Sequence, residues 1–174
     1  MSFLHLFGAS CGVPPFFACI LCLCVSSAVP AWAAGDVITY LVANSSYAAT
    51  RDALVEVIEG EGLVVGAILP FNQMLQGTGH KGAMTPFREA EIVQFCSGAL
   101  AWQMVQEAVE QLAVCPLSIA LYSRVGTAEI MLAYRSPGDG TPSRRQASEL
   151  LRRITARAAE LARFGWTVAP VQLR

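Results

Sequence analysis

Apolar residues recur along this chain with two different periods, and the changes of period predict where helices and strands lie. Spacings of three and four residues, which indicate helices with one buried face, occur in three stretches. Short runs rich in β-branched and aromatic residues, which favour strands, lie between them. We therefore predict an order of strand, helix, two strands, helix, two strands and helix, with strands at 37–44, 63–71, 89–96, 117–122 and 128–135 and helices at 47–60, 98–112 and 144–164.

The stretch 89–123 is the centre of this prediction, because it changes from strand to helix to strand with one cysteine at each junction. Ser97 can cap the helix, and Pro116 prevents its continuation. A strand, a helix and a strand in one sheet form a right-handed parallel crossover. Such a helix rises roughly 22 Å, so we expect Cys96 and Cys115 near opposite edges of the sheet. A disulfide between them is then disfavoured, unless the helix is much shorter than its pattern indicates.

These elements predict one α/β (α+β) domain over residues 34–174, a two-layer sandwich of order βαββαββα with a mixed sheet and helices mainly on one face. Its core spans 37–137, and its last helix spans about 144–164. Alternation along the strands separates two sets of side chains. Those predicted to face the helices are Val93, Phe95, Leu117, Ile119, Leu121, Ile130, Leu132 and Tyr134. Those predicted to line the open face are Gln94, Cys96, Ser118, Tyr122, Arg124, Glu129, Met131 and Arg135. Because this face is half polar, it suits solvent, a ligand or a second copy of the chain.

The first 33 of the 174 residues have the composition of an export signal. No Asp, Glu, Lys or Arg precedes Asp36, and an apolar run at 16–29 is followed by Ala31-Trp-Ala33, with small residues where a signal peptidase reads. We interpret residues 1 to about 33 as a cleaved signal peptide and expect a periplasmic or secreted protein. The run is short for a membrane span, so we expect none after cleavage. The positive start of a signal peptide is missing, which leaves an uncleaved anchor or a misassigned start as alternatives.

Sequence motifs of common catalytic sites are missing from the predicted mature chain. It contains no H-E-x-x-H, P-loop, nucleophile elbow or paired-cysteine zinc spacing. Glycines 77, 79 and 82 have the spacing of a dinucleotide fingerprint, but Pro86 stands where a helix should follow, so we interpret 72–88 as a glycine-rich loop. The net charge of -1 is balanced and does not favour nucleic acid as a partner. Alternating arginines and glutamates on the 144–164 helix favour a solvated, ion-paired face over an anion-binding patch.

The two cysteines and one histidine of the predicted mature chain are the main candidates for chemistry. Cys96 precedes a helix N-terminus, whose dipole favours a thiolate. It could form a mixed disulfide, join another subunit or bind a soft metal, or it could simply be a small buried side chain. The redox candidates are Cys96 and Cys115, and the candidate ligand-binding residues are Cys96, His80, Tyr122, Arg135 and Gln94.

Soft-metal chemistry is an alternative that the residue types leave open. Thioether, thiolate and imidazole donors suit Cu(I), and the chain supplies them at Met74, His80, Met84, Cys96 and Met104. Their spacing matches no rigid metal motif, so the sequence assigns no metal site and no cofactor. His80 could also act as a base if its loop folds over Cys96.

Several segments resemble the domain of unknown function 302 family. The resemblance covers about residues 40–137 and rests on the helix from Tyr47 to Gly62 before Leu63-Val-Val, on Ile92-Val-Gln-Phe95, on LAVCPLSIALY at 112–122, on Gly126 and on Leu132-Ala-Tyr-Arg-Ser-Pro137. It implies a compact α/β domain, frequently a stand-alone protein, without an agreed catalytic site. At Phe95-Cys-Ser-Gly98 family members commonly carry glycine, asparagine and proline-like residues, and this difference suggests an exported, cysteine-bearing subgroup.

These observations predict an exported, non-enzymatic module that binds a small molecule or a periplasmic protein through the open face and the 72–88 loop. A homodimer stays open as a further use of that face. The alternative function is a periplasmic redox or soft-metal accessory protein that uses Cys96.

Overall fold

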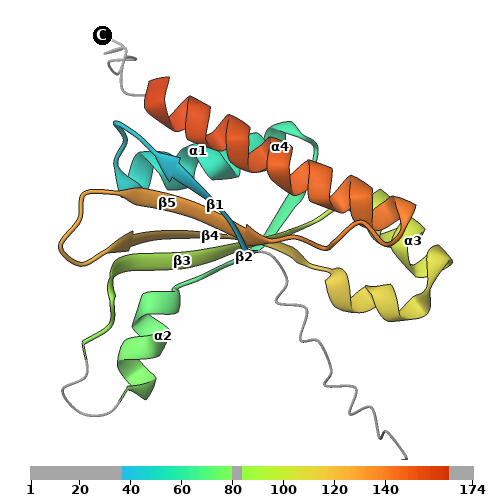
Figure 1. The fold of residues 1–174 in the computed structure, drawn as a ribbon, viewed down its shortest axis with the longest axis horizontal. Helices are drawn as coiled ribbons and strands as arrows, with labels where there is room; N and C mark the ends of the chain where they lie inside the picture. The colour runs from blue at the N-terminus through green and yellow to red at the C-terminus, as the bar shows by residue number, and fades with distance from the viewer. Residues whose placement is uncertain (1–36, 80–83, 165–174) are drawn as a thin grey trace, which may run out of the picture. The chain divides into compact units, whose positions relative to one another are not determined.

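The computed structural model describes residues 37–79 and 84–164. Within these ranges one sheet of five strands forms the frame of the molecule, in the order β1-β5-β4-β3-β2 (Figure 1). The predicted signal segment at 1–33 and His80 lie outside the described residues. The strands are β1 (Val37–Val42), β2 (Val64–Leu69), β3 (Phe87–Cys96), β4 (Leu117–Arg124) and β5 (Ile130–Arg135).

Helices α1 (Tyr47–Gly60) and α4 (Pro142–Phe164) cover one face of this sheet (Figure 1). Helix α3 (Gly98–Glu107) and the short 3-10 helix η1 (Val109–Val114) lie at one end of it, and α2 (Phe71–Thr78) stands on the opposite side beside β3. The two-layer α+β architecture predicted from the sequence is therefore confirmed. The predicted mixed sheet is wrong, because every pairing between neighbouring strands is antiparallel.

The hydrophobic core lies between the sheet and helices α1 and α4. The strand residues predicted to face the helices are all buried, and Val93, Phe95, Ile119, Leu121 and Leu132 have no exposed surface. Strand alternation explains this, since β4 reads buried and half-buried in turn along its first seven residues. No helix among the described residues is long and apolar enough to cross a membrane.

The parallel crossover predicted for 89–123 is wrong, because β3 and β4 are antiparallel neighbours with Phe95 opposite Leu117. Helix α3 ends at Glu107, and Ala108 has an extended backbone at φ -162° and ψ 130°. The chain then turns back through η1, where Val109 and Leu112 are 72% and 67% exposed. The apolar residues Val109 and Leu112, which predicted a longer helix, are therefore exposed and do not pack in the core. The consequence is that Cys96 and Cys115 lie at the same end of adjacent strands.

The segment 72–88, predicted to be a loop, contains most of a helix. Strand β2 ends at Leu69, and α2 begins at Phe71 and ends at Thr78. Pro70 stands at the helix start, where its missing N–H leaves no bond unmade. The Asn72 side chain donates to the carbonyls of Phe87 and Arg88 at 3.3 and 3.1 Å and accepts from Thr85 Oγ1 at 2.6 Å. These bonds fix α2 against the start of β3.

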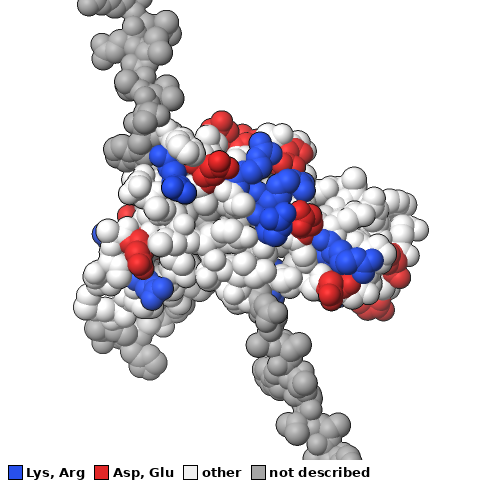
Figure 2. Space-filling model, turned by 45° about the horizontal axis from the view of Figure 1, so that its top comes forward, with Lys and Arg blue, Asp and Glu red and all other residues white. Residues whose placement is uncertain are grey.

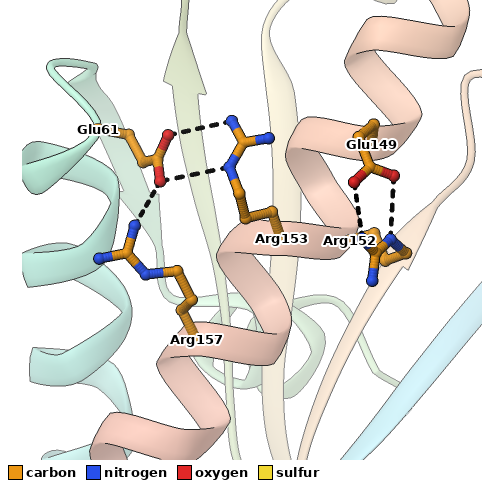
Figure 3. A network of polar contacts seen from close by, with 5 residues as sticks. All are labelled: Glu61, Glu149, Arg152, Arg153 and Arg157. Atoms are coloured by element: carbon orange, nitrogen blue, oxygen red, sulfur yellow. Dashed lines mark hydrogen bonds and ion pairs between the residues drawn. The ribbon is translucent and has the colours of Figure 1, made fainter.

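Ion pairs lie on the outer surface of the helical layer. Glu61, directly after α1, accepts from Arg153 at 3.0 Å and from Arg157 at 2.6 Å, both on α4 (Figure 3). Glu149 pairs with Arg152 within α4 at 2.6 Å. Figure 2 shows a band of basic side chains with acidic side chains beside it on this side of the molecule. This arrangement agrees with the ion-paired face predicted for the helix.

Candidate functional site

An apolar pocket lies on the side of the sheet that α1 and α4 leave bare. Its volume is about 480 Å³, and β3, β4 and the first residue of α2 form its walls. Three aromatic rings line it in series: Phe71 packs edge-on against Phe87 with centroids 6.4 Å apart, and Phe87 packs edge-on against Tyr122 at 5.6 Å. The other lining residues are Pro86, Ala90, Glu91, Ile92, Ala120, Leu121 and Arg124.

The sequence around this pocket explains why it is hollow. Ala90 stands opposite Tyr122 in the β3–β4 ladder, and Ala120 stands between Ile92 and Ala133. These small side chains leave space beside the rings, because neighbouring strands hold their backbones at a fixed separation. The bonds from Asn72 hold Phe71 at the rim. The sequence analysis missed Phe71 and Phe87, and the signal for them was the aromatic residue directly after each of two prolines at 70 and 86.

The candidate ligand-binding residues do not form one site. Tyr122 lines the aromatic pocket. Gln94 lies further along the open face, between Ala67 and Ser118 in the strand ladder, and is half-buried. Arg135 is exposed at the end of β5 and borders a separate hollow beside Arg144. His80 lies outside the described residues, so its distance from Cys96 is not described.

The structure brings the two redox candidates together. Cys96 is exposed at the end of β3, and Cys115 is half-buried directly before Pro116 and β4. Burial and the neighbouring Cys96 thiol raise the pKa of Cys115. Cys115 Sγ also lies 4.0 Å from Sδ of Met104, a fully buried residue of α3. The other proposed Cu(I) donors, Met74 and Met84, are 54% and 86% exposed on the segment around α2.

A second polar cluster lies under the start of α1, on the helical side of β3 and β4. Tyr47 donates from its hydroxyl to the Leu121 carbonyl at 3.2 Å, and burial together with the Glu91 carboxylate raises the pKa of Tyr47. Within the described ranges, Glu91 Oε2 and Ser123 Oγ are buried without a hydrogen-bond partner. The signal for this cluster was present in the sequence, because strand alternation places Glu91 on the face that packs against the helices.

Metal-ligand groups of the usual kind are not found in the part of the chain that the structure describes. There, no three residues of the types His, Cys, Asp and Glu come together to hold an ion.

The fold defines a small two-layer α+β domain with one bare sheet face that carries an aromatic pocket. The chain belongs to the family described as Domain of unknown function DUF302, whose model matches residues 38–161. The comparisons indicate only a domain of unknown function.

A solved structure described as an uncharacterized conserved DUF302 protein from Bacillus stearothermophilus is similar to this chain. The two share 19% sequence identity and a TM-score of 0.53, over 72% of this chain and 94% of that one. At this identity the likeness concerns the fold alone. No curated protein matches the chain.

Proposed function

We propose that the protein acts by binding, and that it takes a small apolar ligand in the pocket formed by Phe71, Phe87 and Tyr122. The observation that carries this proposal is the pocket itself, a hollow of about 480 Å³ on the open sheet face. Small-molecule sites typically measure roughly 300–1,000 Å³ and have mainly apolar and aromatic walls with a few polar groups. The pocket meets both conditions.

The lining residues favour a particular class of ligand. The edge-to-face rings of the pocket suit a ligand with an aromatic or flat apolar group. The edge of an aromatic ring is partly positive and its face is partly negative, so a further ring can pack against either. Arg124 is exposed beside the rings and forms no ion pair with any residue in 37–79 or 84–164. A free guanidinium at the rim favours an anionic group on the ligand. The ligand class that fits is a small aromatic or apolar molecule with one anionic group.

We also propose that this binding takes place outside the cytoplasm. The support is the apolar run at 16–29 followed by Ala31-Trp-Ala33. Intact mass of the protein from the exported fraction tests this part separately. A chain that begins near residue 34 is expected, and a full-length chain retained in the cytoplasm contradicts it.

A fluorescence titration with 1-anilinonaphthalene-8-sulfonate tests the pocket, since this probe is aromatic and anionic. We expect one saturable site on the native protein, and several-fold weaker binding after Phe87→Ala or Tyr122→Ala. Arg124→Gln should weaken this probe but leave the neutral analogue N-phenyl-1-naphthylamine nearly unaffected.

The matched control is Trp102→Ala, because Trp102 is 66% exposed on α3, away from the pocket. This change should leave the titration unchanged. If Trp102→Ala reduces binding as much as Phe87→Ala does, the probe binds exposed apolar surface in general and the proposed pocket function is wrong. Near-ultraviolet circular dichroism of each variant confirms that the native packing is kept.

A further inference from the structure

Three sulfur-bearing residues lie in the region where the end of β3, helix α3 and the start of β4 come together. Cys96 ends β3, Met104 lies on the buried side of α3, and Cys115 stands one residue before the Pro116 that leads into β4. The pairing of Phe95 with Leu117 places both cysteines at the same end of the β3–β4 ladder. This cluster is independent of the aromatic pocket, since Cys96 and Phe87 stand at opposite ends of β3.

The separation of two of these sulfur atoms, those of Cys115 and Met104, fits ligands of one metal ion. Cys115 Sγ and Met104 Sδ are 4.0 Å apart. A metal–sulfur bond of about 2.3 Å places two ligands of a trigonal planar centre about 4 Å apart. Sulfur atoms in simple contact have a similar separation, so the distance is compatible with both. The Cys96 thiol adds a third sulfur ligand, because the pairing of Phe95 with Leu117 brings the end of β3 beside the segment that carries Cys115.

We propose that Cys96, Cys115 and Met104 bind one Cu(I) ion through two thiolates and one thioether. Thiolate and thioether are soft ligands, and this combination selects Cu(I) over the harder divalent ions. Structural zinc takes four ligands, and no third His, Cys, Asp or Glu joins this cluster among residues 37–79 and 84–164. Binding forms three copper–sulfur bonds and releases the two thiol protons to solvent.

The three residues differ in exposure, and this difference defines a route by which a metal ion can enter from solvent. Cys96 is exposed, Cys115 is half-buried and Met104 is fully buried. An ion arriving from solvent, or from a donor thiolate of another molecule, meets Cys96 first and can then be held by all three sulfurs. Met104 is already fixed by the core, so its thioether costs little ordering when the ion binds.

Competition against bicinchoninate, a coloured Cu(I) chelator, tests the proposal under anaerobic, reducing conditions. We expect the protein to withdraw one Cu(I) per chain from the chelator, and X-ray absorption to show a shell of sulfur neighbours only. Cys96→Ser and Cys115→Ser should each abolish this retention. Met104→Leu conserves volume and should remove one sulfur neighbour. It should weaken retention by more than about tenfold, the smallest loss that even outer partners of metal ligands typically cause.

Met131→Leu is the matched control, because Met131 lies half-buried on β5 and outside the cluster. It should bind Cu(I) as the unchanged protein does. The proposal is overturned if the protein takes no copper from the chelator, or if Met104→Leu changes neither retention nor the sulfur shell while circular dichroism shows a native fold. It is also overturned if Cys96 and Cys115 are recovered as a disulfide that persists in the reductant.

Discussion

The carboxylate of Glu107 joins the end of α3 to the start of α4. Its Oε1 accepts the backbone N–H of Ser143 at 2.9 Å, and its Oε2 accepts the Ser143 hydroxyl and the Gln111 side-chain amide. Hydrogen bonds from Ser143 and Thr141 are the main causes that lower the pKa of Glu107 to about 2. An anion at a helix N-terminus is also favoured by the helix dipole. One side chain thus stabilises the contact between two helices that are distant in sequence.

We expect Glu107→Gln to lower the melting temperature at neutral pH, because the amide replaces a charged acceptor by a neutral one. The folded-state pKa lies below the usual carboxyl value of 4.5. The stabilisation is therefore fully present above pH 4.5 and is lost as the pH falls toward 2. Thermal unfolding at pH 7 and near pH 2 should show a difference that closes at the acid end. Glu110→Gln, an exposed neighbour on η1, serves as the control. A difference that is equal at both pH values contradicts the role assigned to the charge.

At the residue scale, the sequence indicates which residues are candidates for a site better than it indicates which residues they contact. Tyr122 and Cys96 stand out from composition and strand alternation, which are local properties. Phe71 reaches the pocket only because Asn72 bonds to the start of β3, 15 residues further along the chain. Such a contact depends on tertiary structure and leaves no periodic signal.

At the scale of elements, the pair α1 and α4 is joined by the Glu61 ion pairs at their exposed edge (Figure 3). Glu61 has a side chain only 17% exposed, and hydrogen bonds from Arg153 contribute most to its lowered pKa. Exposed pairs are typically worth less than about 1 kcal/mol, and the arginines here are 43% and 57% exposed. The contribution is therefore small, and core packing supplies most of the contact between the helices.

We expect Glu61→Gln to lower the free energy of unfolding by about 0.5–1 kcal/mol, because two arginines lose one shared partner. The loss should shrink in 1 M salt, which screens such pairs. Urea unfolding at low and high salt measures both quantities. Asp52→Asn is the matched control, since its pair with Arg51 is more exposed and joins neighbouring residues of one helix. If the two variants behave alike, Glu61 does not link the helices.

The elements themselves were largely predictable, and their pairing was not. Apolar period located all three long helices and the five strands, because each buries one face or alternates. The helix predicted for 98–112 ends at Glu107, although the period continues through Leu112. The extended Ala108 and the bond from Gln111 to the Met104 carbonyl favour a turn there. This local change reverses the chain, makes β4 antiparallel to β3, and brings Cys115 to Cys96.

At the scale of the whole molecule, the two faces of the sheet differ in burial and in the residues that they carry. One face packs against α1 and α4 and holds the core. The other carries the aromatic pocket and several exposed apolar side chains, including Leu41 at 56% and Val64 at 72% exposure. The core thus lies on one face, and the pocket of the proposed function lies on the other, so the bare face can change its side chains with little loss of core packing.

Adjacent residues of β5 test this separation directly. Leu132 points into the core and is fully buried, whereas Met131 lies half-buried on the bare face. We expect Leu132→Ala to lower the free energy of unfolding by about 3 kcal/mol, because it removes buried contacts and leaves a cavity. Met131→Ala should cost about 1 kcal/mol or less, since it exposes little additional apolar surface. Urea unfolding of the two variants measures the difference. Equal losses would mean that the bare face is also packed in solution, as in a face-to-face pair of chains, and sedimentation analysis of the unchanged protein would then detect that pair.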